Sequence, residues 1–399
     1  MTEPNHPSAV KYDVIIVGAG PAGLSTALHL AKLSPEFSAR TLILEKAQHP
    51  RPKLCGGGIL PDAEAVLQQL GLDINELPHV DVEWAHFDFD GQGFRFRPDP
   101  GRPFAFRTIR RHEFDAWLAA KVREGGFMIH ENTSVKSITV TEGGVILATD
   151  QGEYQAAVVI GADGSNSIIR QAIHPREELH VARLLEVVTE AKAEKSTHKQ
   201  SNSYFDFVVL PQGILGYVWD FPALEQGRPV RVRGIYDGNV FPVKAKVSLR
   251  SALEEEFVRH GLQLSDYKLE GHPLRWFEAG SVFSAPRILL VGDAAGADAL
   301  FGEGISIALG YGGLAASAIL EAFTRQDFSF ENYRRIILHS EMGKALRRRT
   351  WWAKFFYHLH WPFIQRVTWH FLGPVIVWIM RHYLIGWAGR QERRKSKVF

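Results

Sequence analysis

Three glycines near the start of the chain have the spacing of a dinucleotide site. Gly18, Gly20 and Gly23 follow the apolar run 14–17 and match the pattern G-x-G-x-x-G. The first glycine permits a tight turn, the second lets the backbone approach a pyrophosphate, and the third lets the next helix pack closely on the strand. The N-terminus of that helix favours an anion, because its N–H groups are unpaired and its dipole is positive there.

Glu45 is placed to complete this site. A helix-period run, 22–33, and a second short strand, 41–44, lead to this acid, which follows Gly23 by about 20 positions. A carboxylate at the end of that strand can accept a hydrogen bond from a ribose hydroxyl. The pattern therefore predicts a nucleotide site, since a glycine-rich turn without a ligand does not explain the acid.

Cys55 is the single cysteine of the chain and precedes Gly56, Gly57 and Gly58. Three consecutive glycines predict a loop whose backbone passes close to something flat or bulky. One cysteine excludes a disulfide framework and any multi-cysteine metal or iron–sulfur site, so we expect no metal and a reducing compartment. The N-terminal residues lack the basic and apolar regions of a signal peptide, so we expect a cytoplasmic protein.

Tyr217, Trp219 and Phe221 alternate along a predicted strand. Side chains two residues apart on a strand point to the same face, so these three form an aromatic wall suited to a flat or polyisoprenoid ligand. Ordinary core packing is the alternative interpretation.

Two Asp/Gly pairs follow buried strands further along the chain. Asp163-Gly164 comes after the strand 156–160, where a simple strand-end turn is the alternative. Gly292-Asp293 ends another strand, and the segment 302–305 then opens a long helix. The acid at 293 can accept from a sugar-phosphate hydroxyl, and the helix N-terminus can stabilise negative charge.

The remaining pattern predicts the elements that position these residues. A hairpin is expected around Asp90-Gly91, and a helix follows from residue 109. Further strands are predicted at 134–140, 145–149, 204–210, 215–221 and 230–236, with an amphipathic helix at 249–260. With 399 residues, 45% of them hydrophobic and 23% charged, the chain has room for two or three domains.

The C-terminal tail has a composition of its own. From residue 347 onward it holds 11 Lys/Arg against one acid, so it carries about +10, and it contains six of the ten tryptophans. Basic residues interleaved with aromatics suit an anionic surface. Because no stretch reaches about 18 apolar residues without a charge, we expect interfacial helices on an anionic membrane, with residues 390–397 attracted to lipid. A helical cap over the cavity or a dimer contact is the alternative, and nucleic acid is not expected.

Five motifs resemble those of the geranylgeranyl reductase family of FAD enzymes. They are K-x-C-G-G-G at 53–58, R-x-x-F-D-x-x-L at 111–118, Asp163-Gly164, Y-x-W-x-F-P at 217–222, and G-D-A-A-G with G-E-G-I at 292–305. Two departures stand out: Pro211 lies six residues before Tyr217 rather than three, and the loop 297–301 lacks a proline. The resemblance implies that FAD contacts Gly18, Gly20, Pro21, Ala22, Gly23, Glu45, Lys46, Cys55, Gly56, Gly57, Arg111, Asp163, Gly164, Asp293, Gly304 and Ile305. For Arg111 an exposed helix-face charge is the alternative.

The resemblance also implies an α/β fold (α+β mixed): a Rossmann-like FAD-binding domain, an interleaved antiparallel β-sheet substrate domain and a C-terminal helical tail. We expect residues 10–80, 105–175 and 285–325 in the first, 81–104 and 176–284 in the second, and 326–399 in the tail.

The implied activity is reduction of carbon–carbon double bonds in a polyprenyl chain, with the wall of Tyr217, Trp219 and Phe221 and the thiol of Cys55 at the reacting end. Tyr217 and Cys55 are the candidate proton donors. The electron donor is NADPH or ferredoxin, since no second G-x-G-x-x-G unit occurs. The alternatives are an FAD monooxygenase or halogenase acting on an apolar substrate, and a non-catalytic isoprenoid-binding flavoprotein.

Overall fold

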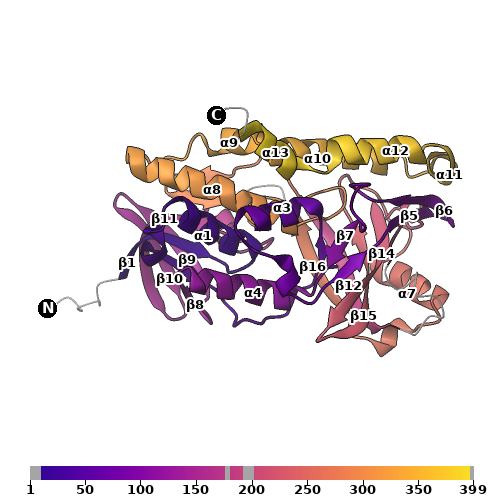
Figure 1. The fold of residues 1–399 in the computed structure, drawn as a ribbon, viewed down its shortest axis with the longest axis horizontal. Coiled ribbons are helices and arrows are strands. Elements are labelled where there is room, and N and C mark those ends of the chain that lie inside the picture. The colour runs from indigo at the N-terminus through magenta and orange to yellow at the C-terminus, as the bar shows by residue number, and fades with distance from the viewer. Residues whose placement is uncertain (1–9, 176–179, 192–201, 396–399) are drawn as a thin grey trace.

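The computed structural model describes residues 10–175, 180–191 and 202–395. Two large sheets lie side by side, with helices along one long side of the pair (Figure 1). The α/β fold predicted from the sequence is confirmed. Ser396 and Lys397, which close the predicted basic segment, lie outside the described residues.

The first sheet has eight strands and carries the glycine motif at the end of its central strand. Its path is β17-β18-β11-β1-β2-β8, with β10 attached to β11 and β9 attached to β10. The central pairs are parallel, and residues 14–17 of β1 are apolar and buried because a parallel strand is covered on both faces. The strands are β1 (Val10–Val17), β2 (Thr41–Leu44), β8 (Met128–His130), β9 (Val135–Thr141), β10 (Gly144–Thr149), β11 (Gly152–Gly161), β17 (Ser284–Ala285) and β18 (Ile288–Leu290).

Helices flank this sheet and begin at the glycine motifs. Helix α1 (Pro21–Leu33) starts directly after the first motif, and α8 (Ile305–Arg325) starts after the second. The two pack against each other. The other helices of this part are α2 (Phe37–Arg40), α3 (Pro61–Gln69), α4 (Arg111–Glu124) and α5 (Ile168–Ile173), with 3-10 turns η1 (Ile74–Glu76) and η4 (Gly292–Ala294).

The second sheet has seven strands in the order β16-β12-β15-β14-β13-β5-β6. One face packs under α7 (Leu249–Arg259), and the other face lies beside the tail helices (Figure 1). The strands are β5 (Ala85–Phe89), β6 (Gln92–Phe96), β12 (Val181–Glu190), β13 (Ser203–Asp206), β14 (Gly216–Glu225), β15 (Arg228–Asp237) and β16 (Glu270–Arg275). A small third sheet joins β3 (Gly58–Ile59), β7 (Phe106–Thr108) and β4 (Val80–Val82), and η3 (Leu264–Asp266) follows α7.

Two local expectations can be compared directly with these strands. The hairpin β5–β6 turns at Asp90 and Gly91, whose φ angles of 54° and 75° suit a two-residue turn, as predicted. The strand predicted at 204–210 is too long. The observed strand β13 ends at Asp206, whose side chain accepts the N–H of Val208 at 2.9 Å. Pro211 then lies in a 3-10 turn, η2 (Leu210–Gln212).

The tail is helical and packs along both sheets (Figure 1). It comprises α9 (Tyr333–His339), α10 (Glu341–His358), α11 (Pro362–Phe371), α12 (Gly373–Ile379), a π-turn (Met380–Leu384) and α13 (Trp387–Lys395). Ile337, Leu346 and Trp387 belong to the core of the first sheet, whereas Tyr357 and Trp369 belong to that of the second. The tail therefore joins the two cores, and the predicted domain limits stay a prediction.

Two segments have the length and composition of a membrane span. One is α8, of which 67% is buried inside the protein, as expected of a core helix. The other is the pair formed by Pro362–Phe371 and Gly373–Leu384, which bends by 78° between its two parts. Gly373 and Pro374 stand at that break, and both residue types interrupt helices.

Candidate functional site

A cavity of about 620 Å³ runs between the two sheets and brings together the predicted site residues. One end is formed by the glycine loop and the start of α1, and the middle by the Cys55 loop and the start of α8. The aromatic side chains of the second sheet form its floor, and residues of the tail close its far end. The wall thus contains segments from distant parts of the sequence.

The glycines at the nucleotide end are required by their backbone surroundings. Gly18 has a φ of 107°, and a Cβ there would lie 2.4 Å from the carbonyl oxygen of Ala162. A Cβ on Gly23 would lie 2.1 Å from the oxygen of Gly18, so α1 packs tightly on the turn. Gly20, Pro21 and the following Ala22 line the cavity.

Glu45 is buried beside this turn and fixes it. Its Oε2 accepts the N–H of Ala19 at 2.8 Å, and its Oε1 accepts the N–H of Ala47 at 3.1 Å. Both Glu45 and Lys46 line the cavity. Contact of Glu45 with a ribose hydroxyl stays a prediction, but the carboxylate lies where the motif requires it.

Arg111 is buried at the start of α4, so the interpretation as an exposed helix-face charge is wrong. Its Nε and Nη2 donate to the two carboxylate oxygens of Asp115 at 2.9 and 3.0 Å. Burial opposes the charge, but Asp115 and Cys55 outweigh that effect and raise the pKa of Arg111 above its ordinary value. A fixed positive charge therefore lines the middle of the cavity.

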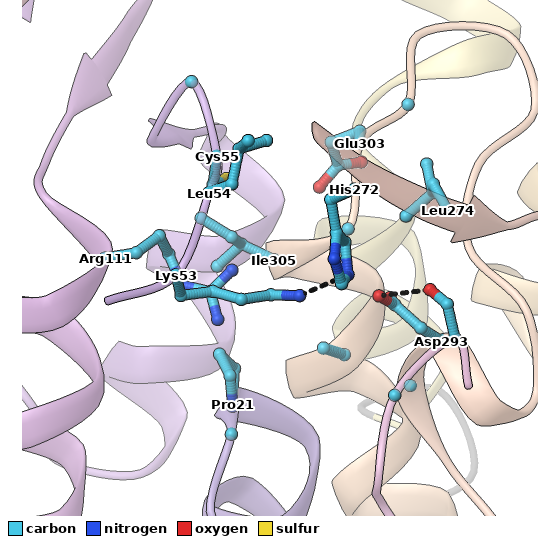
Figure 2. A pocket seen from close by; sticks show the side chains of 18 of the residues that line it. Pro21, Lys53, Leu54, Cys55, Arg111, His272, Leu274, Asp293, Glu303 and Ile305 are labelled. Carbon is cyan, nitrogen blue, oxygen red and sulfur yellow. Dashed lines mark hydrogen bonds between the residues drawn. The ribbon is translucent and has the colours of Figure 1, made fainter. Parts of the chain in front are cut away.

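The two Asp/Gly pairs meet at the first sheet but hold their side chains differently. The carboxylate of Asp163 accepts from Ser167 Oγ at 2.5 Å and from the N–H of Ile168 at 2.7 Å, so it caps α5. Burial raises the pKa of Asp163. Asp293 accepts from Ser165 Oγ at 3.3 Å and projects toward the cavity (Figure 2). Asp163 and Gly164 both border the cavity, and their contact with FAD stays a prediction.

The Cys55 loop passes between α4 and the second sheet. Gly57 has a φ of 78°, and a Cβ there would lie 2.0 Å from the oxygen of Ile109. A Cβ on Gly56 would lie 3.0 Å from the ring of Phe221. The thiol of Cys55 accepts the N–H of Gly57 at 3.4 Å, and its own N–H donates to Glu186 Oε1 at 3.3 Å. The loop is therefore positioned by close backbone packing.

The predicted aromatic wall lines the cavity. Tyr217, Trp219 and Phe221 are all buried, and the wall continues through Phe205 and Phe87 of the neighbouring strands. Phe205 stacks on Phe87 with centroids 4.6 Å apart. We call these five residues the aromatic floor. Burial raises the pKa of Tyr217, and its hydroxyl donates to the carbonyl of Phe301.

Lys53 and His272 form a polar pair in the cavity that sequence reasoning did not single out (Figure 2). Lys53 Nζ lies 2.6 Å from His272 Nε2. Burial and the charge of Lys53 lower the pKa of His272 to about 4, and burial lowers the pKa of Lys53. Lys53 stands inside the recognised motif, whereas His272 comes from β16 and only the fold brings it here.

The start of α8 is tied to the tail by a buried ionic cluster that was also not predicted. Arg349 of α10 donates to Glu303 Oε2 at 2.6 Å and contacts Asp298 at 3.4 Å. Glu303 Oε1 accepts the N–H of Ser306 in the first turn of α8, beside Gly304 and Ile305. Arg349, Met380 and Ile385 line the cavity, so the tail forms one of its walls.

The residues present fit a bound dinucleotide flavin. A turn that admits no side chain at Gly18 leads to a helix N-terminus that opens onto the cavity. The buried carboxylate of Glu45 lies at one end, and the positive Arg111 lies beside the middle. The glycine loop, Glu45 and Asp293 would hold the nucleotide part, and the Cys55 loop with the start of α8 would border the ring.

The chain is similar in sequence to known FAD-binding proteins. The FAD binding domain family matches residues 11–298. A digeranylgeranylglycerophospholipid reductase of Methanopyrus kandleri is 29% identical over 80% of this chain and 83% of its own length.

Two solved structures share the fold. A geranylgeranyl bacteriochlorophyll reductase-like protein of Thermoplasma acidophilum covers 95% of this chain and 100% of its own, with 19% identity and a TM-score of 0.70. The p-nitrophenol 4-monooxygenase of Pseudomonas putida covers 94% of this chain and 97% of its own, with 20% identity and a TM-score of 0.71. Reductases and oxygen-using enzymes thus have the same architecture.

Proposed function

The chain belongs to the FAD binding domain family and is an FAD-dependent oxidoreductase related to the geranylgeranyl reductases, and from this premise we propose that it saturates carbon–carbon double bonds of a polyprenyl chain. The observation that carries the proposal is the shared cavity: the aromatic floor continues directly from the Cys55 loop. A long apolar chain on this floor would place one double bond beside the flavin site.

For the reduction of an isolated double bond, holding the bond in the right position matters more than a strong base. Bound FAD, once reduced, supplies a hydride. An unactivated alkene accepts a hydride poorly, so the cavity must hold the bond in place and exclude water. The aromatic floor supports both requirements, because it offers an extended apolar surface on which the hydroxyl of Tyr217 is already engaged with the carbonyl of Phe301.

The tail end of the cavity is where the substrate would enter. Arg381 Nε donates to the oxygen of Pro98 at 3.1 Å, and its Nη2 donates to the oxygen of Arg97 at 3.0 Å. Pro98 and Met380 border the cavity on the two sides of this contact. The contact joins the π-turn to the loop after β6, so separating these two segments would open the floor to a lipid chain.

Anaerobic turnover tests the proposed reaction. The holoenzyme, reduced with dithionite and mixed with a geranylgeranyl lipid, is expected to yield a product heavier by two hydrogens for each bond reduced, detected by mass spectrometry. NADPH and reduced ferredoxin are then compared as donors. A product that forms only with oxygen, and contains it, would show a monooxygenase instead. Bound lipid with no product would show a non-catalytic isoprenoid-binding flavoprotein.

Two variants test the assigned cavity. Cys55→Ala and Trp219→Ala are expected to keep bound FAD and lose turnover, since both residues line the cavity beside the flavin loop. If both variants keep full turnover, the substrate does not lie on this floor.

We also propose that the outer face of the tail docks on an anionic lipid bilayer. Among the described residues, fifteen large apolar side chains are exposed, and ten of them lie between Trp351 and Tyr383. Phe363, Phe371 and Trp378 are 76%, 67% and 51% exposed. Basic side chains accompany them, such as Arg366, which is exposed and pairs with the exposed Asp90, and this combination of aromatics and basic residues suits an interfacial helix.

A further inference from the structure

Glu186 is a buried acid in the cavity and was not among the site residues predicted from the sequence. It lies on β12, is 5% exposed, and lines the cavity near the Cys55 loop. Its Oε1 accepts the N–H of Cys55 at 3.3 Å, so the carboxyl group is held against the loop that borders the flavin site. Its Oε2 is buried and has no hydrogen-bond partner among the residues that the structure describes.

The register of the second sheet explains why Glu186 lies on the cavity side of β12. Glu186 pairs with Gly234 of β15, and Gly234 pairs with Trp219 of β14. Directly paired residues share a face, so Glu186 and Trp219 point the same way on either side of a glycine. The row continues through Phe205 and Phe87. We call it the cross-strand row; it has an acid at one end and aromatic rings along the rest.

The charges around Glu186 leave its acid form accessible. Burial raises the pKa of Glu186 to about 7, and Glu270, which precedes it in the row, acts in the same direction. Arg110, Arg111 and the N–H of Cys55 act against this rise. A carboxyl group with such a pKa holds a proton near neutrality and can release it, which general acid catalysis requires.

The two donors predicted from sequence are less well placed to release a proton. The hydroxyl of Tyr217 donates to the carbonyl of Phe301, so its proton is already engaged. The thiol of Cys55 accepts from Gly57 and lies next to the charge of Arg111. Glu186 combines burial, a free oxygen and contact with the same loop.

We propose that the Glu186 carboxyl group donates the proton in the reduction of the prenyl double bond, an inference that rests on the proposed function. The electron pair of the double bond forms a C–H bond with this proton at the less substituted carbon. The other carbon receives the hydride of the reduced flavin, so the alkene gains two electrons that the flavin loses. The carboxylate then regains a proton from solvent. The rings of Trp219 and Phe205 face the positive charge that develops on the second carbon.

The test compares Glu186→Gln with Glu190→Gln. Glu190 lies on the same strand and is exposed, so it controls for the loss of a carboxylate. With dithionite-reduced holoenzyme, Glu186→Gln is expected to slow product formation about 10²- to 10⁴-fold while keeping bound FAD. Glu190→Gln is expected to match wild type, and Glu186→Asp to recover part of the rate.

A second measurement does not depend on turnover. Infrared spectra of the wild-type holoenzyme are expected to show a protonated carboxyl band that disappears as the pH rises through about 7 and that is missing in Glu186→Gln. If wild type reduces the lipid and Glu186→Gln is equally fast, the assignment of Glu186 is overturned and the proposed function stands. If wild type itself yields no reduced lipid, both fall, whatever the infrared band shows.

Discussion

The indole of Trp219 lies over Gly234 in the neighbouring strand, so that a Cβ at residue 234 would be 2.2 Å from Cζ2 of the ring. Gly234→Ala is therefore expected to overpack the floor and to destabilise the protein by about 1–3 kcal/mol. In a Trp219→Leu background the same change is expected to cost less, because the ring contact is gone, although the backbone oxygen of Leu185, 2.3 Å from the added Cβ, still opposes the methyl group. Urea unfolding of wild type, the two single variants and the double variant gives the coupling free energy between residues 219 and 234.

Gly271→Ala on β16 is the control for adding a methyl group to this sheet, since its nearest neighbour is the flexible side chain of Leu185 at 3.1 Å. Additive costs for Gly234→Ala and Trp219→Leu would contradict the contact.

The first sheet could be predicted because its signals are local. The glycine motif, the strand at 41–44 and the acid after it follow one another within about 30 residues, and each depends on neighbouring backbone. The hairpin at Asp90 was found for the same reason. The strand predicted to reach residue 210 was too long, because an apolar run does not reveal that Asp206 caps its own end.

The parts of the site that were missed depend on tertiary contacts. His272 and Glu186 stand on strands with no motif, and only the sheet register places them beside the Cys55 loop. Arg349 is one of several arginines in the tail, and the sequence around it does not show that its side chain is buried. The tail was expected on a membrane surface, with a cap over the cavity as the alternative, and the sequence did not show which of its residues, such as Met380, line the cavity.

Glu45→Gln tests the nucleotide end. The neutral amide accepts a weaker hydrogen bond from Ala19, and a hydrogen bond to a charged group contributes about 1.5–3 kcal/mol. Binding of FAD is therefore expected to weaken about ten- to hundred-fold. The measurement is the fraction of protein that retains flavin absorbance after dilution. Glu36→Gln, at an exposed site, is the control, and equal flavin content in both variants would exclude this role.

The stability of the protein is expected to depend on pH through Glu186. Its pKa in the folded state, about 7, exceeds its ordinary value of 4.5, so the folded state keeps a proton that the unfolded state has lost. Wild-type stability should therefore fall as the pH rises from about 4.5 to about 7 and then level off. Glu186→Gln lacks this loss, and its advantage over wild type should grow across the window by at most roughly 3 kcal/mol.

Urea unfolding at several pH values measures this difference. Glu190→Gln should follow the wild-type curve, and parallel curves for Glu186→Gln and wild type would show that the carboxyl group is already ionised when folded.

Arg349→Met tests the link between the tail and α8. The change leaves the carboxylates of Glu303 and Asp298 buried without their cation, and breaking such a pair costs about 3–5 kcal/mol. We expect a lower melting temperature and weaker retention of FAD, because Glu303 borders the start of α8. Arg348→Met changes an exposed neighbour and should leave both properties unchanged. Equal behaviour of the two variants would mean that the cluster does not hold the tail.

If the outer face of the tail docks on lipid, removing its apolar side chains should selectively weaken binding to vesicles. A triple variant, Phe363→Ser, Phe371→Ser and Trp378→Ser, removes apolar surface from the face and should reduce co-sedimentation with phosphatidylglycerol vesicles more than tenfold. Added salt should weaken binding of the wild type. The control places serine at Leu33 and Val258, which are exposed elsewhere. Unchanged binding with loss of a dimer in light scattering would show a subunit interface instead.

Because the strands are evenly spaced, the cross-strand row presents its side chains at fixed intervals. Neighbouring strands lie about 4.8 Å apart, so the five strands from β12 to β5 set the distance from Glu186 to Phe87 at roughly 19 Å. A prenyl chain stretched along the row would meet one strand after another at fixed intervals, and the double bond that stops at the acid would be selected by how far the chain reaches. Bulk added at Phe205 or Phe87 should therefore shift which bond is saturated, without altering the chemistry at the acid.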